Sequence, residues 1–268
     1  MFKVLDAYSL KARLFPALLA VIPALAALAI LISWNRFSLT SGIATTAIPL
    51  LVFAAADIAR RLGKRLEEQI YHESGGKPSV AMLRYSDQTF DAATKAQYRA
   101  LLSSKIGQPV PSEQEEKDNP KAADAFYERG GGWLRENTRN TNKFPVLSSE
   151  NTTYGFRRNL LGSKWPALGL NAVVVLLCLF ILYRKGAIDT DDDATIRLLI
   201  VLAFAVIHAL YMVFAVSKQS VIDAWRTYGR QLLLSCEAFI GKEKPFRPPT
   251  KPRGGRAQSS GQERANEL

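Results

Sequence analysis

The chain has 268 residues, 48% of them hydrophobic, and its 35 Lys and Arg against 24 Asp and Glu give a formal net charge of +11. The apolar residues gather in long stretches, a pattern that excludes a disordered chain and an ordinary soluble domain. The two cysteines, Cys178 and Cys236, have no nearby partner in the sequence. We therefore predict no disulfide framework, no metal site and no cofactor.

Four apolar stretches dominate the sequence; they cover residues 14–34, 39–59, 165–183 and 196–216. Each has about the twenty residues needed to cross a bilayer core, and a backbone in hydrocarbon must satisfy its own hydrogen bonds as a helix. The sequence therefore predicts an all-α protein with four transmembrane helices in two hairpins and a mainly helical cytosolic insert between spans two and three. The first span is long and lacks a small-residue cleavage site, so we interpret it as a retained anchor.

These stretches divide the chain into five predicted parts. Residues 1–59 form the first transmembrane hairpin, and residues 60–164 form the cytosolic insert with an interfacial segment before the third span. Residues 165–216 form the second hairpin. Residues 217–241 continue as a cytosolic helical extension, and residues 242–268, rich in Pro, Gly and basic side chains, are expected to be a disordered tail.

Basic residues lie on one side of the predicted spans. Arg60 and Arg61 directly follow the second span, and Arg157 and Arg158 precede the third, whereas the loop after the third span is acidic at its centre. The positive-inside rule then places the N-terminus, the insert and the C-terminus in the cytoplasm. Basic charge beside a membrane predicts contact with anionic lipid head groups, and no zinc spacing or RNA-binding motif points to nucleic acid.

The segment just before the third span mixes aromatic and basic residues. Residues 151–165 include Arg157 and Arg158 and end at Trp165. Such a composition is typical of a helix that lies in the membrane interface. We therefore expect residues 151–165 to lie on the cytosolic leaflet, with these three side chains at the level of the head groups.

Local signals predict the first helices of the insert. An amphipathic continuation of the second span should end near Glu73, before a Gly-Gly-Lys-Pro turn. Residues 79–87 form either a short strand or an extended loop. Asp91 is the expected cap of a helix that runs through about Lys105. Its predicted buried residues are Ala93, Ala96, Tyr98 and Leu101.

Further capping signals follow along the chain. Ser112 and Glu115 match a capping box, and Asn119-Pro120 opens another helix. Glycines at 130–132 should interrupt that helix, because each glycine costs about 1 kcal/mol relative to alanine. After the fourth span, an apolar stripe predicts a helix that ends near Gly241. We expect this helix to pack against the cytosolic extension of the second span, because neither is stable alone.

Polar side chains with a possible chemical role are few, and three lie within the predicted spans. His208 either hydrogen-bonds to a neighbouring helix, the interpretation we favour, or lines a path through an oligomer. Asp57 has the spacing of a local ion pair with Arg60 or Arg61, and Asn171 could hydrogen-bond across helices. No nucleophile, acid pair or ligand set has usable spacing, so we predict no catalytic, cofactor-binding or metal-binding residue.

Five short motifs carry a resemblance. They are KARLFPA at 11–17, GKP at 76–78, ADAFYE at 123–128, FPV at 144–146 and ENTTYGFRRNL at 150–160. Together they resemble uncharacterised bacterial four-span inner-membrane proteins of the kind found in phage-defence gene neighbourhoods. The resemblance implies a membrane-acting effector or sensor in the bacterial inner membrane, and it supplies no catalytic residues.

This architecture favours a non-enzymatic inner-membrane effector. Its cytosolic domain would respond to a signal or a soluble protein partner, and its spans, assembled as a homo-oligomer, would perturb or permeabilise the membrane. The alternative is a membrane-anchored scaffold or sensor that recruits a soluble partner without forming a pore. The sparse polar content of the spans favours this alternative.

Overall fold

A computed structural model describes residues 7–31, 40–186 and 190–240, except for the side chains of residues 31 and 40–49. All regular structure in these ranges is helical and none of it is strand, which confirms the predicted all-α class. The predicted tail at 242–268 lies outside the described residues, as do the tips of both predicted hairpins.

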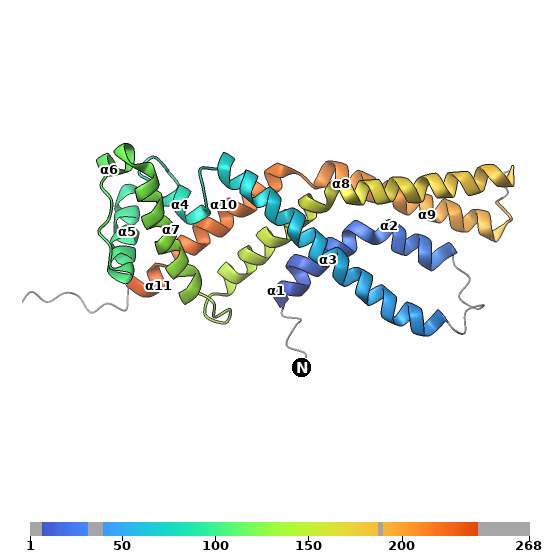
Figure 1. Cartoon of the computed structure of the whole chain (residues 1–268), viewed down its shortest axis with the longest axis horizontal. Helices are drawn as coiled ribbons and strands as arrows, with labels where there is room; N and C mark the ends of the chain where they lie inside the picture. The colour runs from blue at the N-terminus through green and yellow to red at the C-terminus, as the bar shows by residue number, and fades with distance from the viewer. Residues whose placement is uncertain (1–6, 32–39, 187–189, 241–268) are drawn as a thin grey trace, which may run out of the picture.

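The molecule is elongated, with two helix groups at opposite ends (Figure 1). Helix α8 (Pro145–Lys185) is a single helix of 41 residues that runs from one group into the other. Helix α3 (Thr40–Glu73) also enters both groups. The sequence predicts that the first half of α3 spans the membrane and that its second half lies in the cytosol. In the structure, both halves belong to one continuous helix.

Within the described residues, three helical segments are long and apolar enough to cross a membrane. They are Leu10–Ile30, Pro145–Lys185 and Asp193–Ala215. The first joins the π-helix η1 (Leu10–Leu14) to α2 (Phe15–Leu31), and the last joins α9 (Asp193–Leu210) to the π-helix η3 (Tyr211–Ala215). A short α1 (Ala7–Ser9) precedes them.

The count of four spans is therefore not reproduced. The second predicted span, 39–59, falls on the first part of α3, which is not among the three candidates within the described residues. This helix is charged from Asp57 onward, and the side chains of 40–49 lie outside the described part. Large apolar residues just before Asp57 are nevertheless exposed, with Leu50 71% and Phe53 55% accessible. The arrangement in two hairpins remains a prediction.

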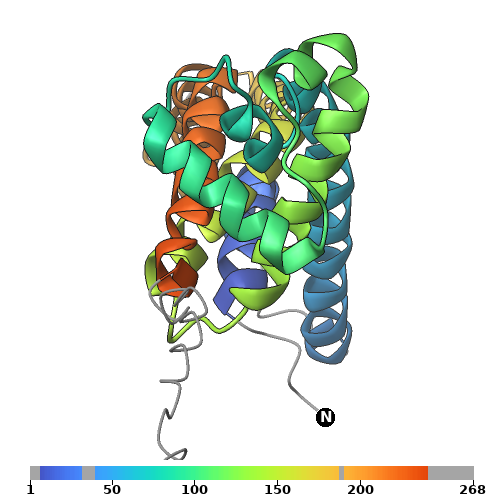
Figure 2. The same cartoon turned by 90° about the vertical axis from the view of Figure 1, so that its left-hand side faces the viewer.

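The other end of the molecule is a helical domain with its own core. It comprises α4 (Pro78–Leu83), α5 (Ala92–Ile106), α6 (Glu113–Asp118), α7 (Pro120–Asn137), α10 (Lys218–Leu234) and α11 (Glu237–Ile240). Helix α5 lies across the end of the molecule (Figure 2). The insert and the segment after the last span share one hydrophobic core. Its fully buried side chains include Ile70, Leu83, Tyr98, Leu102, Tyr127, Leu134, Leu232 and Leu233.

Helix boundaries that depend on local capping are confirmed. Helix α3 ends at Glu73, and the Asp91 carboxylate accepts a hydrogen bond from the Thr94 amide at the start of α5. Ser112 and Glu115 form the predicted capping box. Such caps need only residues within one turn of each other, which is why the sequence predicts them.

The structure corrects the prediction for residues 79–87, which were expected to form a short strand or an extended loop. They begin as helix, because α4 spans Pro78–Leu83 with proline at its first position. The two alternatives considered, a strand and an extended loop, are both wrong for this half of the segment. Five of its six residues are buried, so tertiary packing against α7 and α10 stabilises a helix too short to form alone.

The triple glycine is a second correction. Helix α7 continues through residues 130–132 without interruption. A Cβ at Gly131 would lie 2.0 Å from the Ser79 Oγ, and one at Gly130 would lie 3.0 Å from Leu102 Cδ1. The glycines therefore let α7 approach α4 and α5 closely, and the packing that results offsets their low helix propensity.

Burial along α5 also differs from expectation. Tyr98 and Leu101 are buried as predicted, but Ala93 and Ala96 are exposed. Lys95 and Arg99 occupy the buried face instead, each only 4% accessible.

Two predictions near the membrane are also corrected. Residues 151–165 are part of the continuous α8 rather than a separate helix lying flat, although Trp165 is 77% exposed. The extensions of the second and fourth predicted spans pack mainly on α8, which contacts both α3 and α10. An ion pair between Glu73 and Lys218 joins their ends. The α8 helix thus supplies the surface that each extension was expected to provide for the other.

Candidate functional site

The candidate site is the junction where α3 crosses α8, between the helical domain and the apolar helices. Gly63 and Gly162 meet there: a Cβ at Gly162 would lie 2.5 Å from the Gly63 amide nitrogen. A Cβ at Gly63 would lie 2.3 Å from the Asn159 Oδ1. The two backbones are thus in contact, as at helix crossings built on small residues. Beyond the crossing, α3 and α8 diverge (Figures 1 and 2).

A buried ion pair lies one turn from this crossing. The Arg158 Nη1 is 2.5 Å from the Glu67 Oε1, and their side chains are only 9% and 18% exposed. The Tyr154 hydroxyl donates to the same carboxylate oxygen at 3.1 Å. Burial, and secondarily the charge of Glu67, raises the pKa of Tyr71 on the neighbouring turn. The pair therefore joins α3 to α8 in a region from which water is largely excluded.

The same stretch of α8 holds the first helix. The Asn159 Nδ2 donates to the Ala12 carbonyl at 2.6 Å, within the π-helix η1. A Cβ at Gly155 would lie 3.0 Å from the Ala12 Cβ and 3.1 Å from the Tyr8 hydroxyl. The hydrogen bond from Asn159 and the close approach at Gly155 together hold η1 against α8.

Two cations of α8 bind the end of the last apolar helix. The Lys164 Nζ donates to the carbonyls of Val213 and Val216 at 3.1 and 2.8 Å. The Arg157 Nη1 donates to the Ser220 carbonyl at 2.9 Å, in the first turn of α10. Lys164 thus satisfies carbonyls at the C-terminal end of the last apolar helix, which have no intrahelical partner, whereas Arg157 contacts the N-terminal turn of α10. Between residues 155 and 164, helix α8 therefore contacts α1, η1, α3, η3 and α10.

These contacts change how the predicted interface residues are understood. Arg158 lies inside the protein, only 8% exposed, so the expectation that it lies at the head groups is wrong. The cause is Glu67, which lies 91 positions away in the sequence and pairs with it. Arg157 is half-buried against α10, whereas Arg61 and Trp165 are exposed and Arg60 is half-buried.

Asn171 and His208 each make a polar contact between apolar helices. The Asn171 Nδ2 donates to the Ala205 carbonyl at 2.9 Å and joins α8 to α9. The His208 Nε2 lies 3.0 Å from the Leu19 carbonyl, to which it donates, and so joins α9 to α2. Both side chains contact backbone of a neighbouring helix in the same chain. This is the geometry expected if His208 and Asn171 bridge helices. Among the described atoms, the Asn171 Oδ1 and the His208 Nδ1 are buried without a partner.

Asp57 does not join these two residues. Its carboxylate pairs with Arg61 Nε at 2.7 Å, one turn along α3, as the spacing predicted. Both side chains are well exposed. The described residues contain no group of three or more His, Cys, Asp or Glu side chains placed to hold a metal ion. The three polar candidates therefore act as separate contacts rather than as one site.

Lys95 and Arg99 are buried cations that sequence reasoning missed. The Lys95 Nζ donates to the carbonyls of Arg84 and Tyr85 at 2.9 and 3.2 Å, and the Arg99 Nε donates to the Leu83 carbonyl at 2.9 Å. These carbonyls follow the end of α4, so the cations terminate that helix. Burial, and secondarily repulsion from Arg99, lowers the pKa of Lys95. Their i, i+4 spacing on α5 was the one available signal.

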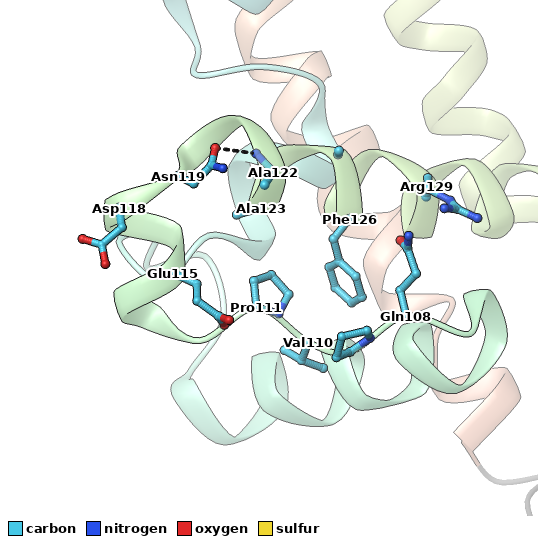
Figure 3. Close-up of a pocket in the computed structure, with 12 residues that line it drawn as sticks. Gln108, Val110, Pro111, Glu115, Asp118, Asn119, Ala122, Ala123, Phe126 and Arg129 are labelled. Atoms are coloured by element: carbon cyan, nitrogen blue, oxygen red, sulfur yellow. Dashed lines mark hydrogen bonds between the residues drawn. The ribbon is translucent and has the colours of Figure 1, made fainter.

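A concave pocket of about 520 Å³ opens at the far end of the helical domain. Figure 3 shows Phe126 of α7 projecting into it toward Val110 and Pro111, with Glu115 and Arg129 at its edges. Its floor is apolar and its rim carries both signs of charge. Surfaces of this composition are suited to binding part of another protein.

Comparison with known proteins does not assign the chain to a family. No protein-family model, no curated protein and no solved structure matches the chain. The function is therefore inferred from the junction, the apolar helices and the pocket.

Proposed function

We propose that the protein is a non-enzymatic inner-membrane effector whose helical domain acts on its membrane helices through the α3–α8 junction. The domain responds to a signal or a soluble partner in the cytoplasm. The membrane helices, assembled as a homo-oligomer, then perturb or permeabilise the bilayer. Phage infection is the activating condition that we propose to test first, on the resemblance described above.

The observation that carries this proposal is the construction of the junction. Helices α3 and α8 each run from the domain into the apolar group, and their backbones touch at Gly63 and Gly162. The buried pair between Arg158 and Glu67 fixes their rotation about this point. Because packed helices change position as rigid bodies, a shift of α3 in the domain must move its other end in the membrane.

The proposed topology has four spans, with the first part of α3 as the second of them. The N-terminus, the helical domain and the C-terminus lie in the cytoplasm, and anionic lipid head groups contact the basic residues at the boundary. A cysteine introduced at Asp193 should react with an impermeant reagent from the periplasm. Labelling from the cytoplasm alone would contradict this orientation.

The function is tested by inducing expression in cells and recording membrane potential and dye entry, with and without phage infection. Gly162→Ala separates α3 from α8, since its Cβ meets backbone. Gly169→Ala is the matched control on the same helix, because a Cβ there has nothing within 4 Å. We expect depolarisation by the unmodified protein and the control, and its loss in Gly162→Ala. Unchanged potential and growth under every condition would contradict the proposal.

The second candidate is a membrane-anchored scaffold that recruits a soluble partner without a pore. The pocket beside Phe126 favours it, since its apolar lining is bordered by the exposed charged side chains of Glu115 and Arg129. Crosslinking in native membranes distinguishes the two. A stoichiometric soluble partner that is lost on Arg129→Glu, a change at an exposed residue of the pocket, would support the scaffold, whereas crosslinks between copies alone would favour the effector. We expect no nucleic acid among the crosslinked species.

A further inference from the structure

A small cavity lies at the cytosolic end of the first two predicted spans, between α1–η1 and α3. Its volume is about 170 Å³, and Arg13, Leu14, Phe53, Asp57 and Arg60 are among the residues that line it. The first helix contributes residues from the start of a candidate span, and α3 contributes residues from the end of its apolar part. The cavity is therefore built by two helices at one level of the molecule.

The two ends of this cavity differ in chemistry. On α3, Arg60 and Asp57 lie at the cytosolic end, and Phe53 lies one turn deeper. On the first helix, Arg13 is followed directly by Leu14 and the apolar α2. Polar groups thus line the end at the membrane surface, and apolar groups line the end toward the bilayer core. This order matches the head group and the acyl chains of a phospholipid.

The side chains that line the cavity carry a net positive charge. The Asp57 carboxylate is already paired with Arg61, which is not a lining residue. Within the described residues, Arg60 has no carboxylate partner, and Arg13 contacts only the face of the Tyr8 ring, 5.5 Å from its centroid. Two half-buried guanidinium groups therefore line the cavity together with one carboxylate, that of Asp57, which is already paired with Arg61. Arginine forks match the geometry of phosphate oxygens.

We propose that this cavity binds one anionic phospholipid, with its phosphate between Arg13 and Arg60 and its acyl chains along Leu14 and Phe53. Basic pockets between membrane helices on the cytoplasmic side are suited to such head groups. The inference rests on the membrane placement proposed above for α2 and α3. It does not require that the protein depolarise the membrane, so the two proposals can fail separately.

The test is native mass spectrometry of the full chain in detergent, titrated with dioleoylphosphatidylglycerol or dioleoylphosphatidylcholine. The Arg13→Gln/Arg60→Gln variant should bind the anionic lipid about 30-fold more weakly, as expected for two lost cation contacts. The matched control is Lys64→Gln/Arg65→Gln, which removes the same charge from exposed residues of α3 outside the cavity. We expect it to change affinity less than about threefold.

Three results would overturn the proposal. An equal loss of affinity in both double variants would show general attraction rather than a site. Equal binding of the two lipids by the unmodified protein would exclude head-group recognition, and this comparison needs no variant to fold. Displacement of the lipid by soluble glycerol phosphate at millimolar concentration would assign the cavity to a free phosphate. Failure of glycerol phosphate to compete, together with the selective loss, would support the lipid.

Discussion

The buried pair between Glu67 and Arg158 should be strongly coupled. Both side chains are less than one-fifth exposed, and the two atoms are 2.5 Å apart. Glu67→Gln leaves the Arg158 guanidinium buried without a counter-charge, with only neutral acceptors such as the Asn159 Oδ1 at 3.3 Å. Removal of one member of such a pair costs about 3–5 kcal/mol, because a charge stays buried without its partner.

The double variant Glu67→Gln/Arg158→Met removes both charges and should recover much of that loss. We expect a coupling free energy of about 2–3 kcal/mol from the double-mutant cycle. The assay is reversible unfolding of the purified protein in mixed micelles, followed by circular dichroism. Arg158→Met alone should cost less than Glu67→Gln, because the Tyr154 hydroxyl still donates to Glu67 at 3.1 Å.

The matched control is the exposed pair of Glu136 and Arg139, whose atoms are 2.6 Å apart but whose side chains are 64% and 75% exposed. Its coupling should be about 0.5 kcal/mol or less, because solvent screens the charges. Equal coupling in the two cycles would refute the reasoning that burial, rather than distance, determines the strength of the junction pair.

Three further changes have defined outcomes. Gly131→Ala should destabilise the helical domain by about 1–3 kcal/mol through overpacking, whereas its neighbour Gly132→Ala should stabilise it by about 0.5–1 kcal/mol, as measured by thermal unfolding. His208→Phe should lower stability by about 0.6 kcal/mol and leave activity intact; loss of a pH-dependent conductance would instead support a pore. Burial raises the pKa of Tyr98 and Tyr127, so the unfolded state loses these protons first and stability should fall as pH rises above about 10. Absorbance at alkaline pH should show both ionising together with unfolding, and ionisation in the folded state would contradict this.

The features predicted from sequence are those fixed by near neighbours. The cap at Asp91 and the capping box at Ser112 each depend on residues three positions away. The ion pair of Asp57 with Arg61 depends on residues one helical turn apart. Hydropathy likewise needs only a window of residues, and three of the four predicted spans coincide with candidate spans. In each case the determining contact is local, so its partner can be read from the sequence.

The missed features depend on distant partners. The glycines of α7 appeared unfavourable because Ser79, which Gly131 must approach, is 52 positions away in the sequence. Arg158 was assigned to the membrane surface because nothing near it in the sequence indicates Glu67. Lys95 and Arg99 were overlooked because their acceptors are backbone carbonyls, which no residue type reveals.

The central claim is that the helical domain drives the membrane helices through the α3–α8 junction. Its most direct test is the membrane potential of phage-infected cells that contain equal membrane levels of the unmodified protein, Glu67→Gln or Glu136→Gln. Both single changes remove one carboxylate paired with arginine, but only the first belongs to the junction. We predict depolarisation with the unmodified protein and Glu136→Gln, and none with Glu67→Gln. Depolarisation of equal extent in all three, or in none, would contradict the account.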